Sequence, residues 1–256
     1  MLKKIILPLL IASSVAATLP IKTFAGTLSV NKPRILMTDK HKRAEFKVFN
    51  TSAQVQTLRV SLIEKQMDEM GDIKTVEVSA TSAAGFLRVG PRVGKNIGPK
   101  DFQKFRVRAK LNKMPKGEYR SHLLVESMNP PTEETKPGIF VKPNIKYSIP
   151  IIIRHGDLHA EVAISNAKVS EKLLTFEMSR MGDRSVYGDF TFYQVTDGKT
   201  TELTQLVGQA IYTDTNKRLF VIDLEQSPTK GSQLKIVFKE NPEFGGDSQT
   251  QTIVEV

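Results

Sequence analysis

Short runs of alternating apolar and polar residues recur along the chain, separated by Gly, Pro, Asn, Asp and Ser. Residues 44–49 (Ala-Glu-Phe-Lys-Val-Phe) and 58–62 (Leu-Arg-Val-Ser-Leu) have the period of two that is typical of half-buried strands. Long patterns with the helical period of 3.6 residues are scarce, and only short segments such as residues 199–207 have some helical character. The first half of the chain therefore predicts a series of strands, which continues through residues 102–111, 119–128 and 139–153.

A second series of short strands is predicted after Leu158. These segments are residues 160–164, 173–178, 190–195, 203–210, 218–224, 234–238 and 250–254. About seven strands in each half is the number found in an immunoglobulin-like sandwich. The pattern restarts after residues 154–157 (Arg-His-Gly-Asp), so we place a domain boundary there. The predicted fold class is all-β, with two immunoglobulin-like sandwich domains in tandem over residues 26–155 and 156–256.

The N-terminus has the pattern of an export signal. Lys3 and Lys4 precede an apolar stretch from Ile5 to Ala17, and Ala25 is a small residue suited to signal-peptidase cleavage. The apolar stretch is short for a membrane span. We therefore expect residues 1–25 to be a cleaved signal peptide and the mature protein to be exported. A retained N-terminal anchor and cleavage nearer Ala17 are the alternatives.

Composition narrows the function classes. The chain has no cysteine, which excludes disulfides, thiol catalysis and cysteine-zinc sites. Lys and Arg number 37 against 27 Asp and Glu, and loss of Lys3, Lys4 and Lys22 with the signal lowers the net charge from +10 to +7. This balance favours an anionic partner in a non-specific way. Export and the scatter of the basic residues along the sequence argue against nucleic acid.

The segment from Ile139 to Ile153 is the most unusual in the sequence. Seven of its eight odd-numbered positions are large and apolar, and it contains Pro143 and Pro150. Fifteen extended residues would span about 50 Å, longer than most strands. Because proline cannot donate a hydrogen bond to a neighbouring strand, we expect an edge or bulged strand. It follows a proline-rich stretch, residues 129–138, that is predicted to be a loop. The polar, mixed stretch of residues 67–85 is the other predicted loop.

A long apolar edge strand invites pairing with another chain, and proteins normally suppress it. Its presence suggests that a foreign strand is added there, with backbone hydrogen bonds and alternate side chains giving affinity and specificity. Ile149, Ile151 and Ile153 are predicted to fill the core of their own domain. The positions assigned to partner binding, the donor strand, are Val141, Pro143, Ile145 and Tyr147.

Several segments resemble the periplasmic chaperones of chaperone–usher pilus assembly. Residues 28–35 (Leu-Ser-Val-Asn-Lys-Pro-Arg-Ile) and 43–50 (Arg-Ala-Glu-Phe-Lys-Val-Phe-Asn) are similar to the first two strands of that family. Residues 115–123 and 147–156 resemble its F and G strands, and residues 183–190 match in the second half. The order and spacing of these segments cover nearly the whole mature chain and look closest to the archaic branch.

The resemblance implies a periplasmic, non-enzymatic function without cofactors. A chaperone of this kind has two sandwiches arranged as a boomerang and lends its G strand to a pilus subunit that lacks its own last strand. It then passes the subunit to an outer-membrane usher. Pilus subunits and the usher are therefore the expected partners, with self-association when the chaperone is free. Neither nucleic-acid binding nor membrane insertion is expected.

The resemblance also implies a site for the C-terminal carboxylate of the subunit, held by two basic residues between the domains. Arg34 matches the first of them, and a guanidinium suits bidentate binding of a carboxylate. The position expected for the second is Pro150, a departure from the family pattern. Lys146 and Arg120 are the substitutes, although residue type alone favours an exposed charge at both.

Other classes of function receive less support from the sequence. Residues 155–159 place two histidines four apart, but Gly156 argues against the helix that a metal site of this spacing needs, so we predict a linker and no metal. A structural or adhesive pilus subunit should carry an N-terminal donor extension and often a cysteine pair, and the chain has neither. A secreted sugar-binding sandwich would use tryptophan for stacking, and the chain has none.

Overall fold

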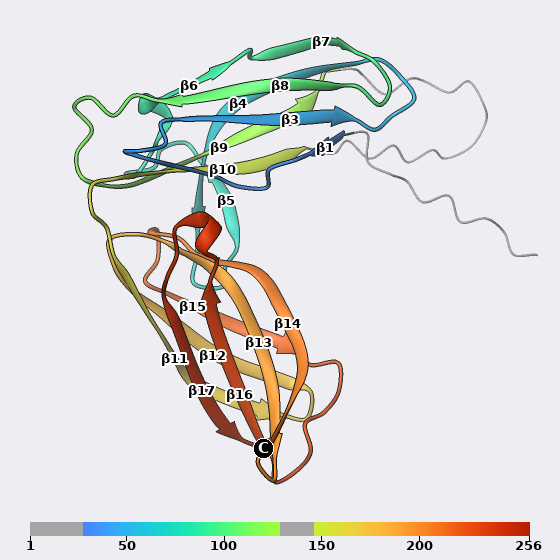
Figure 1. Cartoon of the computed structure of the whole chain (residues 1–256), viewed down its shortest axis with the longest axis vertical. Coiled ribbons are helices and arrows are strands. Elements are labelled where there is room, and N and C mark those ends of the chain that lie inside the picture. The colour runs from blue at the N-terminus through green and yellow to red at the C-terminus, as the bar shows by residue number, and fades with distance from the viewer. Residues whose placement is uncertain (1–27, 129–145) are drawn as a thin grey trace, which may run out of the picture.

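The structure is a computed structural model that describes residues 28–128 and 146–256. Residues 1–27, with the predicted signal peptide, and residues 129–145 lie outside the described part. Within that part no helix is long and apolar enough to cross a membrane. The described chain is built almost entirely of strands (Figure 1).

Ten strands and one 3-10 helix form the first sandwich. They are β1 (Leu28–Val30), β2 (Ile35–Thr38), β3 (Arg43–Asn50), β4 (Gln56–Met67), β5 (Ile73–Val76), η1 (Ala84–Phe86), β6 (Leu87–Gly90), β7 (Val93–Ile97), β8 (Phe102–Ala109), β9 (Gly117–Ser127) and β10 (Tyr147–His155). One sheet has the order β1-β3-β8-β6. The other has the order β2-β10-β9-β4-β5, with β7 also paired to β4.

Seven strands and a second 3-10 helix form the second sandwich. They are β11 (Ala160–Ser170), β12 (Leu173–Gly182), β13 (Val186–Thr196), β14 (Lys199–Ile211), β15 (Lys217–Asp223), β16 (Gln233–Glu240), η2 (Pro242–Phe244) and β17 (Gln249–Glu255). Its sheets are β11-β12-β15 and β14-β13-β16-β17. The predicted fold class is confirmed. In Figure 1 the first sandwich lies across the top and the second extends below one end of it, so the chain has the shape of a boomerang.

Each sandwich closes on its own apolar core, as the alternating patterns predict. In β3, Phe46 and Val48 are buried while Glu45 and Lys47 face outward, and Phe46 stacks on Phe105 of β8 with ring centroids 5.2 Å apart. Burial of such side chains is the main stabilising term in a protein without disulfides.

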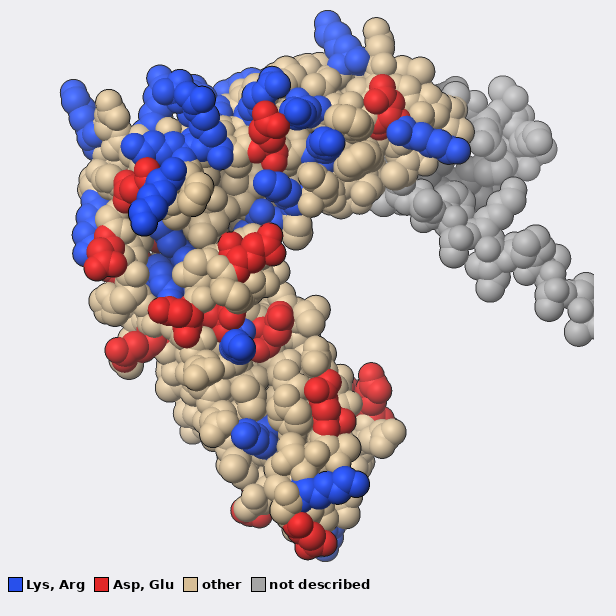
Figure 2. Space-filling model, viewed as in Figure 1, with Lys and Arg blue, Asp and Glu red and all other residues tan. Residues whose placement is uncertain are grey.

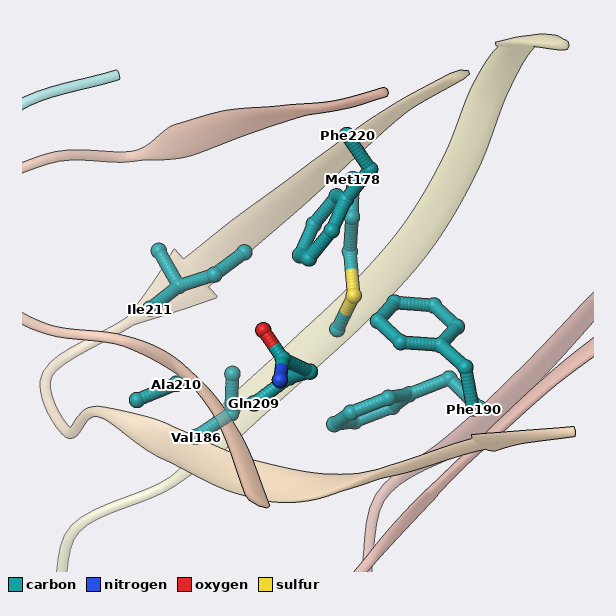
Figure 3. A pocket seen from close by; sticks show the side chains of 8 residues that line it. Met178, Val186, Phe190, Gln209, Ala210, Ile211 and Phe220 are labelled. Atoms are coloured by element: carbon teal, nitrogen blue, oxygen red, sulfur yellow. The ribbon is translucent and has the colours of Figure 1, made fainter. Parts of the chain in front are cut away.

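The second core is built around phenylalanines. Phe176, Phe190 and Phe220 lie in mutual contact, with ring centroids 4.9 to 5.1 Å apart. Figure 3 shows one end of this core, where Met178 and Gln209 point toward the same space as Phe190 and Phe220. That space is too small for a water molecule, so it is packed core and not a ligand site.

One predicted loop contains a strand. Residues 67–85 are polar and mixed in sequence and were expected to be a loop, but β5 pairs with the end of β4, with Ile73 opposite Met67. The residues of β5 are mostly exposed, so they have no apolar alternation to reveal the strand. This hairpin reaches the second sandwich, where the amide of Leu219 donates to the carbonyl oxygen of Glu69 at 2.8 Å.

A buried ion pair gives the second sandwich a predictable response to acid. Arg184 donates to both carboxylate oxygens of Glu240 at 2.8 and 2.9 Å, and the Glu240 side chain is only 1% exposed. Burial alone would raise the pKa of Glu240, but hydrogen bonds from Arg184 and Ser248 outweigh it and hold the pKa below the ordinary 4.5.

The free energy of unfolding should therefore fall in acid. A carboxylate with a lowered folded-state pKa contributes stability above its ordinary pKa, and that contribution is lost as the pH drops through the folded-state value. We expect denaturant titrations to show this loss below about pH 4.5, and Glu240→Gln to be less stable at neutral pH and to have a flatter acid profile. An unchanged acid profile in Glu240→Gln would contradict this assignment.

Candidate functional site

Strand β10 has two different neighbours along its length. Over its whole length it pairs antiparallel with β9, from Tyr147 opposite Val125 to His155 opposite Gly117. On its other side β2 pairs parallel, but only with residues 151–154. Within the described residues, the segment Tyr147–Pro150 thus has a strand on one side and an unpaired backbone edge on the other.

Pro150 lies where this open edge ends. It is the last residue before the pairing of Ile151 with Ile35 of β2 begins. A proline has no amide to donate, so it is tolerated at an edge and not between two strands. The predicted edge strand is therefore present in the first half of β10, whereas the second half is an interior strand.

The odd-numbered side chains of β10 point into the first core. Ile149, Ile151 and Ile153 are buried, as their pattern predicts. Tyr147 is partly buried against the same core, and its hydroxyl donates to the carbonyl oxygen of Leu28 at 2.7 Å. Val141, Pro143 and Ile145 lie outside the described residues, so the donor strand stays a prediction.

Two even-numbered side chains of β10, Ile152 and Arg154, contact the second sandwich. Ile152 packs against Met67, Ala210 and Tyr212 in an apolar cluster that joins the two sandwiches. Arg154 donates to the carbonyl oxygen of Ser185 at 2.9 Å. This face of the sheet is thus one wall of a junction, and the start of the second sandwich is the other.

Arg34 lies at this junction, directly before β2. Its side chain is 5% exposed, and it donates to the hydroxyl of Tyr212 at 2.9 Å. The guanidinium carbon is 4.0 Å from the ring centroid of Tyr187 and 5.9 Å from that of Phe244. Burial lowers the pKa of Arg34, and no ion pair to a carboxylate is formed within the described residues.

Arg120 comes from β9 and shares Tyr212 with Arg34. Its guanidinium carbon is 3.7 Å from the Tyr212 ring centroid, and one Nη donates to Asp214 and to the carbonyl oxygen of Lys65. The other Nη is buried with no hydrogen-bond partner in the described structure. Arg120 is only 4% exposed, so the expectation of an exposed charge at this position is wrong. Asp214 and Lys65 thus engage one Nη of Arg120, and the other Nη is the one that a ligand could use.

His122 stands two residues further along β9, opposite Pro150. Burial, reinforced by the positive charges of Arg120, Lys65 and Arg34, lowers its pKa to about 3. The imidazole is therefore neutral at neutral pH. Its Nδ1 is buried and has no partner among the described groups. The unpartnered buried atoms at the junction thus include one on Arg120 and one on His122, and Arg34 has no acidic partner within the described residues.

Lys146 lies apart from this group. It is 52% exposed and its Nζ is 3.4 Å from a carboxylate oxygen of Glu126. It precedes Pro150 by four residues, about 13 Å along an extended strand. The structure therefore brings Arg34 and Arg120 together around one tyrosine and does not bring Lys146 to them.

The groups that the second sandwich contributes could not be predicted from the sequence. Tyr187, Tyr212 and Asp214 surround the two arginines, although they follow Arg34 by more than 150 residues. Tyr187 lies within a segment that carried the family resemblance, but nothing in its local pattern indicates contact with an arginine.

Comparison with known proteins gives structural matches only. No family model matches the chain, and no curated protein matches its sequence. The crystal structure of the class 5 fimbriae chaperone CfaA matches with 14% identity, 90% of this chain and 99% of that chain covered, and a TM-score of 0.51.

A second match comes from Acinetobacter baumannii. It is a chain of the CsuC–CsuE chaperone–tip adhesion subunit pre-assembly complex of the archaic chaperone-usher Csu pili, with 13% identity and a TM-score of 0.50. The match covers 90% of this chain and 99% of that one. The chain is thus similar in fold, over both sandwiches, to solved structures of fimbrial chaperone systems.

Proposed function

We propose that this protein is a periplasmic chaperone that binds a pilus subunit by donor-strand complementation. The subunit lacks the last strand of its own sandwich and is completed by a strand of the chaperone. The predicted residues of that strand are Val141, Pro143, Ile145 and Tyr147. Binding and release of a strand require no catalysis and no cofactor, so the proposed function is not enzymatic.

The observation that carries this proposal is the open edge at Tyr147–Pro150. At residues 151–154 of β10 this edge is paired with β2. At Tyr147–Pro150 the same edge has no neighbouring strand within the described residues. An open edge beside an apolar, alternating segment is the arrangement that strand addition requires. The fold likeness to CfaA and to the CsuC–CsuE complex supports the same function.

Arg34 is proposed to anchor the C-terminal carboxylate of the subunit. It is a buried cation without an acidic partner in the described structure, and such a charge is stabilised by an incoming carboxylate. The free Nη of Arg120 is the second donor in this proposal, because Lys146 lies just before β10, apart from the two arginines, and is paired with Glu126. The neutral imidazole of His122 lies on the same strand as Arg120, two residues further along and opposite Pro150.

The remaining parts of the proposal concern where the protein acts. The predicted signal peptide places it in the periplasm, where an outer-membrane usher would receive the subunit. The likeness to a complex from archaic Csu pili favours the archaic branch of the family. In the absence of a subunit, the open edge would favour self-association.

The proposed domain bounds are residues 26–155 for the domain with the donor strand and residues 156–256 for the second domain.

Purification of the tagged chain from the periplasm of its native cells tests this function. We expect a polypeptide in one-to-one complex, with an immunoglobulin-like sequence that ends one strand short. Recovery of the chain only as a free monomer, or with a partner whose sandwich is complete, would rule the function out.

Removing the proposed anchor should weaken capture without unfolding the chaperone. Arg34→Ala leaves no carboxylate unpaired, so the variant should stay folded, with a moderate loss of stability from the contacts with Tyr187 and Tyr212 that it removes. Loss of a charge-assisted pair of hydrogen bonds should lower affinity for the subunit by about tenfold to a hundredfold. Lys146→Ala is the matched control and should bind nearly as wild type. Equal affinities for the two variants, measured by titration calorimetry, would refute the anchor.

A further inference from the structure

The outer face of the sheet β1-β3-β8-β6 is strongly cationic. We call this surface the cationic face and define it by the outward side chains of three strands: Arg43 and Lys47 of β3, Lys104, Arg106 and Arg108 of β8, and Arg88 of β6. In sequence these residues are scattered over 66 positions, and the fold gathers them on one surface.

Three of these arginines stand in one row across the sheet. Arg43 pairs in register with Arg108, and Arg108 pairs with Arg88 on its other side. Side chains in such positions have Cβ atoms about 5 Å apart, and like charges directly opposite destabilise a sheet. All three are exposed, and none forms an ion pair within the described residues. A bound anion would relieve this repulsion.

Among the described outward side chains of β3, β8 and β6, Glu45 is the one carboxylate that offsets these charges. Glu45 is 3.0 Å from the Nε of Arg106 and 3.3 Å from the Nζ of Lys104. Lys47 lies over the ring of Phe102, 4.3 Å from its centroid, and not beside an acid. The face therefore carries a large uncompensated positive charge.

The cationic face is separate from the proposed subunit site. Its sheet is the one that does not contain β10, and in Figure 1 it forms the side of the first sandwich away from the second. Figure 2 shows the blue of Lys and Arg concentrated over the first sandwich, whereas the second carries fewer of them on the same view. A partner on this face would leave the open edge of β10 accessible.

We propose that the cationic face docks on the surface of a bilayer rich in anionic phospholipids. Guanidinium groups suit bidentate binding of phosphate, and four of the six cations are arginines. The cations occupy three neighbouring strands and several rows, so they form a two-dimensional grid. An extended acidic peptide would follow one line of charges, while a grid of cations over three strands matches a two-dimensional array of lipid phosphates.

Vesicle sedimentation tests this proposal with the chain purified from the periplasm. We expect binding to vesicles of phosphatidylglycerol and phosphatidylcholine at low salt, loss of binding at high salt, and none to phosphatidylcholine alone. The triple variant Arg43→Gln, Arg88→Gln, Arg108→Gln should bind the anionic vesicles about a hundredfold more weakly. Its unfolding profile should match wild type, and it should still hold a subunit, which separates this proposal from the chaperone function.

The control removes three exposed lysines of the second sandwich by Lys168→Gln, Lys199→Gln and Lys230→Gln. This variant has the same net charge as the arginine variant and should keep its vesicle binding. If both variants lost vesicle binding equally, the net charge of the protein alone would explain the binding, and the proposal would be overturned. Binding to neutral vesicles would also overturn it, as would tighter binding to soluble polyglutamate than to anionic vesicles, which would point to an acidic polypeptide instead.

Discussion

Ile145→Asp is expected to abolish recovery of a subunit from the periplasm while the chaperone itself stays folded and soluble. Ile145 belongs to the alternating apolar positions that are predicted to enter the groove of the subunit. A carboxylate in that groove would be buried without a partner, at a cost of several kcal/mol, so binding should fall by more than about a hundredfold. Charged residues also discourage pairing at strand edges. Co-purification with the tagged variant measures the effect.

The matched control is Val207→Asp, which places the same charge at an exposed apolar position of β14 in the second sandwich. Val207 is 64% exposed and distant in sequence from the predicted donor strand. This variant should hold its subunit as wild type does. Full recovery of the subunit with Ile145→Asp would exclude the donor strand from this stretch of the sequence.

Glu118→Ala is expected to lower the free energy of unfolding by about 3–5 kcal/mol, because it leaves a buried arginine without its acid. The Glu118 side chain is 1% exposed, and it accepts hydrogen bonds from Arg154 at 2.9 Å and from the amide of Ser185 at 3.0 Å. Arg154 in turn donates to the carbonyl oxygen of Ser185. The pair therefore joins β9 and β10 to the start of the second sandwich, and its loss should also loosen the junction. Urea denaturation of the two proteins provides the measurement.

Two further variants test whether the stability lost in Glu118→Ala comes from the buried ion pair. Glu126 lies on the same strand as Glu118, but its partners Lys146 and Arg59 are exposed. Glu126→Ala should therefore lower the free energy of unfolding by less than about 1 kcal/mol. Adding Arg154→Met to Glu118→Ala should restore part of the stability, since an apolar pair avoids the buried charge. If Glu118→Ala were as stable as Glu126→Ala, the ion pair would not be a structural link between the sandwiches.

The strands of both sandwiches could be predicted from the sequence because their burial alternates. Residues 173–178 and 234–238 are such cases, and β12 and β16 extend past them by a few residues at the ends. Residues 199–207 had some helical character, but they form part of β14, where pairing with β13 overrides the local preference. The strand β5 was missed because its side chains are exposed and backbone pairing alone defines it.

The junction could be predicted only in part. Arg34 was identified through the segment around it, but its aromatic neighbours come from the far end of the chain, and sequence spacing does not report such contacts. Arg120 was expected to be exposed because most arginines are. Its burial follows from the second sandwich, which supplies Tyr212 and Asp214. The sequence also did not predict that the second half of β10 is an interior strand, because its parallel partner β2 lies more than 100 residues earlier in the chain.

Hydrogen exchange of β10, with and without a bound subunit, tests the central claim most directly. In the free chain, peptides that cover residues 147–149 should exchange faster than those covering residues 151–154, which lie between β9 and β2. Binding of a subunit should slow exchange at 147–149 and leave 151–154 unchanged. A stable complex in which residues 147–149 exchange as fast as in the free chain would contradict strand addition at this edge.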